Sequence, residues 1–72
     1  MPQRQGDWGR ILRLERLKRG FSQGDVAAAL GTDDRTVRAW EKQEQFPSLY
    51  YRRGLSQAYG KTIEALGLLK ED

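Results

Sequence analysis

The sequence predicts an all-α fold, a compact cluster of five short helices, and three observations support this prediction. Apolar residues recur three and four positions apart along much of the chain, as they do on the buried face of a helix. No stretch alternates apolar and polar residues in the way that a strand does. Residues typical of helix starts and helix ends divide the chain at short intervals, and the helix-ending residues are Gly20, Gly31, Gly60 and Gly67.

Length and composition limit the possible functions. The 72 residues allow one domain, which we expect to span 7–69, between a flexible arm at 1–6 and a frayed tail at 70–72. Cysteine and histidine are both absent, which excludes disulfides, thiolate or imidazole metal sites, and Ser-His-Asp or Cys-His catalysis. We therefore expect no cofactor, no metal and no small-molecule substrate.

The charge balance favours a polyanionic partner. Lys and Arg number 13 against 10 Asp and Glu, which gives a net charge of +3. Such an excess suits nucleic acid or an anionic membrane surface. No apolar stretch is long enough to span a membrane, and the N-terminus lacks the apolar region of a signal peptide. We therefore expect a cytoplasmic protein.

Two helices are predicted in the first part of the chain. Asp7 is a suitable N-cap for a helix from about Trp8 to Arg19, which Gly20 ends. Ser22 starts a second helix, since Ser22 and Asp25 have the spacing of a capping box, and Gly31 ends it. The apolar residues of the first helix are Trp8, Ile11, Leu12, Leu14 and Leu17, and those of the second are Val26, Ala27 and Leu30.

Three further helices follow. Asp33 caps a helix over 34–42, and after a loop over 43–47, with Phe46 turned inward, Ser48 caps a helix that runs to about Tyr59. Thr62 caps a short fifth helix over 63–66. The inward residues are predicted to be Val37 and Trp40 in the third helix, Tyr51, Leu55, Ala58 and Tyr59 in the fourth, and Leu68 and Leu69 after the fifth.

The second and third predicted helices are separated only by residues 31–33. Two helices joined so tightly must cross at a steep angle, which is the helix-turn-helix geometry. Ala27 is small where the third helix would cross the second, and Gly31 tolerates a positive φ in the turn. The shared core would be lined by Val26, Leu30, Val37 and Trp40.

With these residues in place, the chain resembles the helix-turn-helix domains of the Cro and phage-repressor type (XRE-like), which are widespread in bacterial transcription regulators. The resemblance covers roughly residues 9–69 and implies a five-helix, lambda-repressor-like fold. The matching residues are Arg16, Gly20, Phe21, Ser22, Gln23, Val26, Ala27, Leu30, Gly31, Thr36, Val37, Trp40, Glu41, Pro47, Leu55, Ala58, Tyr59, Gly60 and Leu66. One departure is Gln43, where the family often has glycine, so a different or strained turn is expected there.

The resemblance implies that the third helix enters the major groove of double-stranded DNA. Arg35 matches a position that contacts bases, where a bidentate bond to guanine is the natural contact. Asp34 matches another such position and could accept from cytosine N4, although phosphates would repel it. Ala39 matches a third and could contact a thymine methyl group. Thr36 also belongs to the implied DNA-binding surface.

The resemblance further implies contacts with the DNA backbone. Arg38 and Lys42 would reach phosphates, and Gln23 would do so through its side chain and the helix N-terminus, with Ser22 beside it. On the fourth helix, Tyr50, Arg52 and Arg53 are either backbone contacts or a plain exposed face. The remaining implied pair is structural: Arg16 would bridge to Glu41 and fix the third helix.

Three alternatives to DNA binding fit parts of the sequence. A helix-turn-helix can serve as a protein-interaction module, for example in a larger signalling protein, and the acids Asp33 and Asp34 favour this reading. The first helix, rich in arginine and leucine, could lie on an anionic membrane, but a domain this short needs its apolar face for the core. Catalysis by the paired acids is disfavoured because adjacent residues point in different directions. Further domains, or pairing of two copies on DNA, stay open.

Overall fold

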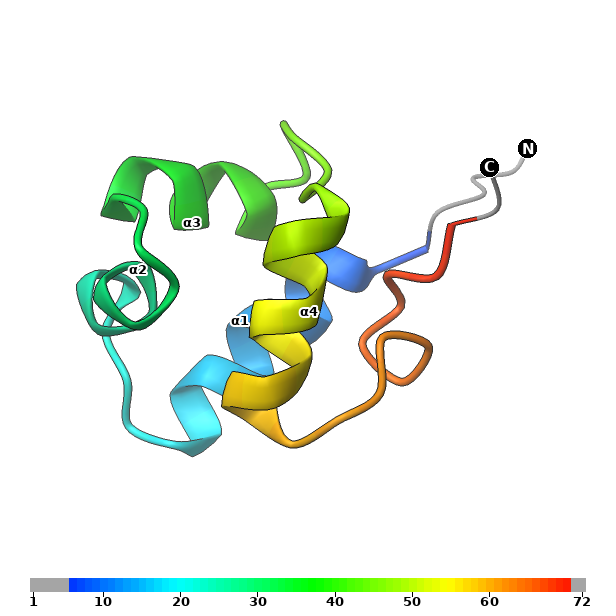
Figure 1. Cartoon of the computed structure of the whole chain (residues 1–72), viewed down its shortest axis with the longest axis horizontal. Helices are drawn as coiled ribbons and strands as arrows, with labels where there is room; N and C mark the ends of the chain where they lie inside the picture. Colours follow the sequence, from blue (N-terminus) through cyan, green and yellow to red (C-terminus); the bar gives the residue numbers. More distant parts are fainter. Residues whose placement is uncertain (1–5, 71–72) are drawn as a thin grey trace.

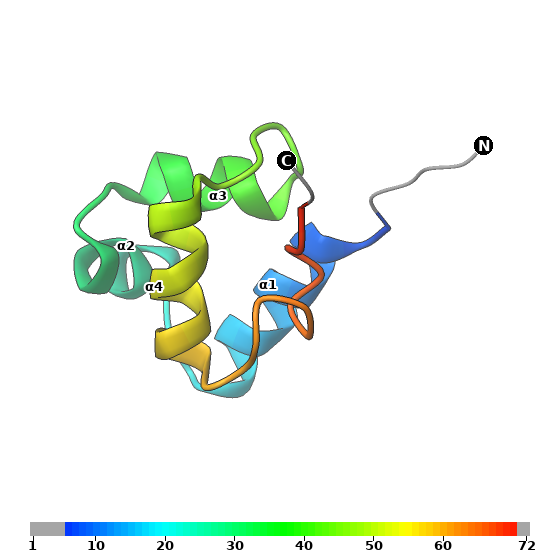
Figure 2. The ribbon, with the colours of Figure 1, turned by 45° about the vertical axis from the view of Figure 1, so that its right-hand side comes forward.

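The computed structural model describes residues 6–70 and contains four helices, with no strand in this part of the chain. They are α1 (Trp8–Lys18), α2 (Gln23–Leu30), α3 (Asp34–Glu41) and α4 (Leu49–Tyr59). In Figures 1 and 2, α3 lies across the top of the molecule, and the segment after α4 turns back along α1. The all-α prediction is confirmed. Most of the predicted arm and tail, 1–5 and 71–72, lies outside the described residues.

The predicted fifth helix is wrong, because the chain after α4 makes only one hydrogen-bonded turn. Thr62 acts as the expected cap, since its Oγ1 accepts from the Ala65 amide at 2.9 Å. Gly67, at φ 76°, then reverses the chain before a second turn can form. Leu66 and Leu68 are fully buried by this reversal, whereas Leu69 is 68% exposed, which corrects the expectation that it folds inward.

The core is formed by residues of all four helices together with Leu66 and Leu68, and α3 packs against both α1 and α2. Its largest fully buried side chains are Trp40 and Tyr59, each at most 2% exposed, and Leu12 and Leu55 are equally buried. Phe46 is turned inward as expected and meets the edge of Trp8, with the ring centroids 5.1 Å apart. A domain of this size thus obtains much of its core from aromatic rings.

Part of the apolar pattern of α1 does not enter the core. Trp8 and Leu12 are buried, but Leu14 and Leu17 are 41% and 47% exposed. They lie on the side of the helix opposite to Leu12 because of the 100° turn per residue. Leu14 and Leu17 therefore form a second apolar strip of α1, which faces outward.

Two glycines allow close approach between helices. A Cβ on Gly54 of α4 would lie 2.6 Å from Cδ2 of Leu30 on α2. A Cβ on Gly9 of α1 would lie 2.5 Å from the carbonyl oxygen of Glu41, at the end of α3. At Gly9 the neighbouring atom is backbone, so α1 and the end of α3 can approach this closely only without a side chain there. At Gly54 a side chain would require the end of Leu30 to shift. No helix among the described residues is long and apolar enough to cross a membrane.

Alkaline pH offers a test of how deeply Tyr59 is packed. Burial raises its pKa to about 12 from the ordinary 10.0. Because the folded state keeps the phenolic proton longer, this stabilisation is complete below pH 10 and is lost between about pH 10 and 12. Between about pH 10 and 12, we expect the free energy of unfolding of the parent chain to fall more steeply with pH than the free energy of unfolding of the Tyr59→Phe variant. The two slopes should differ by up to about 1.4 kcal/mol per pH unit.

The measurement is urea unfolding at closely spaced pH values from 9 to 12 for both chains. Lysines titrate in both, so their contribution cancels in the difference between the two slopes. Parallel pH profiles would show that the Tyr59 phenol is solvated in the folded state.

Candidate nucleic-acid interface

The turn between α2 and α3 is closed by hydrogen bonds on both sides. Gly31 adopts φ 75° and ψ 34°, and the Thr32 amide donates to the Ala27 carbonyl at 2.9 Å, which ends α2. Asp33 caps α3, since its Oδ1 accepts from the amide and the hydroxyl of Thr36 at 2.9 and 2.8 Å. These bonds hold the pKa of Asp33 below its ordinary value. The crossing of the two helices is thereby set locally.

One face of α3 is buried and the opposite face is basic. Val37 and Trp40, 2% and 1% exposed, pack into the core. Arg35, Arg38 and Lys42 are exposed to solvent. In Figure 1, α3 lies at the edge of the molecule, so no other described helix covers its outer side. An exposed helix with a row of cations is a suitable shape and charge for the major groove.

The cations of this face differ in their surroundings. Arg38 lies 3.8 Å from the carboxylate of Asp34, one turn earlier, and Lys42 lies 4.0 Å from that of Glu44. Both pairs are solvated, so each contributes little to stability. Arg35 belongs to none of the ion pairs in the described part of the chain. Its guanidinium is therefore the most available one for an external acceptor.

The other predicted residues of α3 differ in exposure. Thr36 and Ala39 are half-buried, and the Thr36 hydroxyl donates to Asp33 within the cap. Asp34 has a side chain that is 61% exposed at the start of the helix, beside the predicted base-contacting arginine, Arg35. The outer face of α3 thus combines cations with one exposed acid.

The N-terminus of α2 uses its side chains internally. Ser22 and Asp25 form the predicted capping box: the Ser22 hydroxyl accepts from the Asp25 amide at 2.9 Å, and the Asp25 carboxylate accepts from the Ser22 amide at 2.8 Å. Gln23 Nε2 donates to Glu41 Oε1 at 3.1 Å. This bond connects the start of α2 with the end of α3, and sequence reasoning did not foresee it. The second N–H of the Gln23 amide is still a potential donor.

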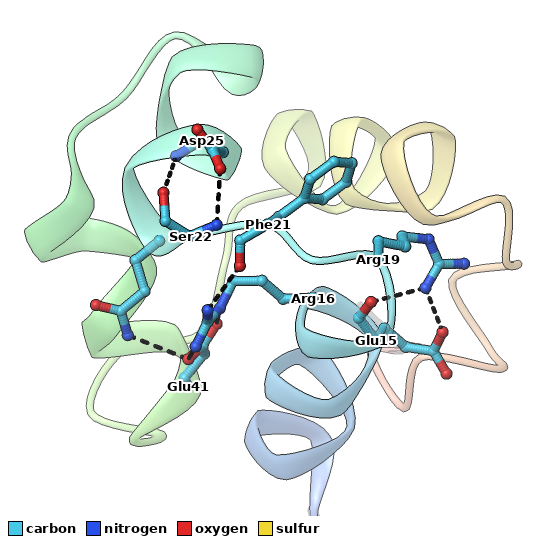
Figure 3. A network of polar contacts seen from close by, with 8 residues as sticks. Glu15, Arg16, Arg19, Phe21, Ser22, Asp25 and Glu41 are labelled. Atoms are coloured by element: carbon cyan, nitrogen blue, oxygen red, sulfur yellow. Dashed lines mark hydrogen bonds and ion pairs between the residues drawn. The ribbon is translucent and has the colours of Figure 1, made fainter.

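Arg16 and Glu41 form a bidentate ion pair between α1 and α3 (Figure 3). The Arg16 Nε donates to Glu41 Oε2 at 2.7 Å and the Nη2 to Oε1 at 3.0 Å. The Nη1 donates to the Phe21 carbonyl at 2.9 Å. The side chains are only 10% and 4% exposed, and the hydrogen bond to Glu41 raises the pKa of Arg16. The pair fixes the end of α3 on α1.

Gln43 supplies a second connection between the same two helices. It has φ 60°, a conformation that strains any residue except glycine, so a strained turn occurs where the sequence predicted one. Its side-chain Oε1 accepts from the Gly9 amide at 2.9 Å. Asp7, the predicted cap of α1, makes no side-chain capping bond. The cap of α1 therefore comes from the loop after α3, which no local pattern could reveal.

Arg52 is buried, and the expectation that it contacts the DNA backbone or solvent is wrong. It is 8% exposed, and its Nε and Nη1 donate to the carbonyls of Pro47 and Leu68 at 3.1 and 3.4 Å. Its guanidinium lies 5.2 Å from the centre of the Phe46 ring. Arg52 thus satisfies loop carbonyls on both sides of α4. Tyr50 and Arg53 are exposed, on a shallow groove beside α2.

Glu15 forms a second buried network, which sequence reasoning missed. Its carboxylate contacts Arg19 at 2.7 Å, Lys18 at 3.3 Å and Lys61 at 3.8 Å. Arg19 also donates to the carbonyl of Tyr59 at the end of α4. The hydrogen bond from Arg19 lowers the pKa of Glu15, with further lowering by the lysines. This network attaches the end of α1 to the end of α4.

Among the described residues, no group of acidic side chains could hold a metal ion. With this arrangement, the fold and the exposed basic helix define a helix-turn-helix domain. A scan against protein families matches residues 12–66, more than half of the chain, to the helix-turn-helix family. The chain therefore belongs to the helix-turn-helix family of the Cro/C1 type (XRE-like). Comparison with curated proteins and with solved structures gives no match.

The Arg16–Glu41 pair can be tested by a double-mutant cycle. Arg16→Met leaves a buried carboxylate without its partner, and Glu41→Leu leaves a buried guanidinium, so each should cost about 3–5 kcal/mol of unfolding free energy. The double variant should lose clearly less than the sum of the two. Urea unfolding monitored by circular dichroism measures all four chains. Additive losses would show that the two side chains do not interact.

Gln43 permits a test that separates backbone strain from capping. Gln43→Ala keeps the strained conformation and removes the acceptor of the Gly9 amide, so it should cost about 1–2 kcal/mol. Gln43→Gly removes the acceptor but relieves about 1 kcal/mol of strain, so it should be close to neutral. Thermal and urea unfolding of the two variants decides this. Equal stability of the two variants would mean that strain at residue 43 is negligible.

Proposed function

We propose that this domain binds double-stranded DNA in a sequence-specific manner, with α3 in the major groove, and acts in transcription regulation. The observation that carries the proposal is the outer face of α3, where Arg35, Arg38 and Lys42 are exposed while the opposite face is anchored in the core. Arg35, free of any described ion pair, would donate to guanine, and Arg38 and Lys42 would contact phosphates. Membership in the helix-turn-helix family supports this reading.

Residues around α3 would complete the contact with DNA. Gln23 would use its second amide N–H on a phosphate while Glu41 holds the first, with Ser22 at the same helix terminus. Ala39 and Thr36 would line the base edges, and Tyr50 and Arg53 would reach the backbone from α4. The role is non-catalytic, and the expected setting is the bacterial cytoplasm.

One feature favours a second function. Asp34 exposes a carboxylate at the start of α3, where phosphates would repel it. A protein partner with a basic surface would accept it readily, so a protein-interaction module is the competing proposal. Salt dependence separates the two, because binding through about four to six phosphates weakens steeply as salt rises. An affinity for DNA that hardly changes between low and moderate salt would favour the protein-interaction module.

The roles of two cations can be distinguished by mutation. After selection of bound sequences from random duplex DNA, Arg35→Ala should lower affinity for the selected site by about 1–3 kcal/mol and relax base preference at one position. Lys42→Ala should weaken binding to all sequences about equally and reduce the salt dependence. Affinity is measured on the selected site and on scrambled duplexes.

An equal loss on all sequences for Arg35→Ala would assign this residue to the backbone instead of the bases. Failure to enrich any sequence at low salt would contradict specific DNA binding altogether.

A further inference from the structure

The outward side of α1 carries an apolar and basic surface that the DNA-binding proposal does not use. Leu14 and Leu17 are 41% and 47% exposed, and Arg10 and Arg13 lie four residues before them. Residues four apart are neighbours on a helix, so each leucine has an arginine directly beside it. Lys18, with a side chain 64% exposed, extends the row of Arg10 and Leu14. We call these five residues the α1 outer surface.

The α1 outer surface shares only Lys18 with the two polar networks of the same helix, since Lys18 lies 3.3 Å from the Glu15 carboxylate. Figure 3 shows Arg16 leaving α1 toward Glu41, and Glu15 leaving it toward Arg19. These inward side chains are neutralised within the molecule. Arg10 and Arg13, by contrast, belong to no ion pair in the described part of the chain. Arg10 and Arg13 are therefore available to an external anion.

The surface also points away from the predicted DNA contact. Arg16 and Gly9 define the side of α1 that faces α3, since they contact Glu41 and Gln43. Leu14 is two positions before Arg16, which places it about 160° around the helix from it. A molecule bound at Leu14 would therefore leave the outer face of α3 free.

We propose that the α1 outer surface binds an acidic amphipathic helix of a partner protein. Two neighbouring leucines form a short apolar ridge that fits between the ridges of another helix. Cations at both ends of the ridge would pair with carboxylates flanking the apolar residues of the partner, which steers association and sets orientation. The charge on the α1 outer surface thus specifies the acidic character of its partner.

Other occupants fit these residues less well. A nucleic-acid backbone would pair with Arg10 and Arg13 but would leave both leucines unused. A membrane-surface helix needs a broad apolar face, and two leucines between cations are too narrow for one. Pairing with a second copy of the same surface would place Arg10 and Arg13 close to the same arginines of the other copy. The repulsion between these like charges disfavours self-pairing.

The experiment uses the full chain labelled with 15N and two synthetic helical peptides. Both peptides have leucines on one face. In the first peptide glutamates flank the leucines, and in the second peptide lysines do. We expect the glutamate peptide to shift the amide signals of residues 10–18 and the lysine peptide to leave them unchanged. Binding should weaken as salt rises, because cations contribute to it. A complex with duplex DNA should still accept the peptide.

Two variants and one control sharpen the test. Leu14→Ala with Leu17→Ala keeps good helix formers at exposed positions, so the fold is retained, and it should weaken peptide binding at least tenfold. Arg10→Gln with Arg13→Gln should weaken it similarly and reduce the salt dependence. The matched control is Leu49→Ala on α4, where the leucine is 46% exposed, and it should not change binding.

Several results would overturn the proposal. They are absence of any shift with the glutamate peptide at millimolar concentration, unchanged affinity in the double leucine variant, and shifts confined to α3. If the glutamate peptide fails to shift the signals of residues 10–18 but vesicles of phosphatidylserine and phosphatidylcholine do, the surface binds lipid instead. If duplex DNA shifts these signals where the peptide does not, the surface binds nucleic acid. None of these outcomes depends on whether α3 binds DNA.

Discussion

The bidentate contact between Arg16 and Glu41 joins more of the molecule than any other polar interaction in the described chain. Arg16 comes from α1, its third donor reaches the Phe21 carbonyl before α2, and Glu41 ends α3 while also accepting from Gln23 at the start of α2. Three helices therefore meet at one carboxylate. A buried pair is costly to desolvate, but its dependence on geometry makes it a good device for holding one arrangement. The exposed face of α3 derives its fixed orientation from this contact.

A second contact between α1 and α3 complements the ion pair. Gly9 lies against the Glu41 carbonyl, and its amide donates to the Gln43 side chain, so the loop after α3 satisfies an amide of the first turn of α1. Gln43 bears a strained φ to do so, where glycine would be unstrained but would offer no side-chain acceptor. Attachment at two places along α1 limits both tilt and rotation of α3.

Buried charge also replaces apolar packing elsewhere in this small domain. Glu15 and Arg52 are 7% and 8% exposed. Arg52 donates to carbonyls of two loops, and Glu15 accepts from Arg19 at the end of its own helix. Glu15 attaches α1 to α4 through Arg19, and Arg52 attaches α4 to the carbonyls of the loops at Pro47 and Leu68. With few apolar side chains available, such charge-assisted bonds to otherwise unpaired carbonyls hold the irregular segments in place. As a result, the outward side chains of α1 and α3 are displayed on a fixed frame.

The sequence by itself determined the all-α class, the limits of the first four helices to within about a residue or two, and the crossing of α2 and α3. These follow from local causes: apolar spacing, the caps at Ser22 and Asp33, and the left-handed turn at Gly31. Only the tertiary structure decided that Gln43 caps α1 and that Arg52 is buried. Each of these depends on which distant segment lies against the residue, and spacing along the chain carries no information about that. The fifth helix failed for a local reason, because the reversal at Gly67, which buries Leu66 and Leu68, leaves room for one turn only.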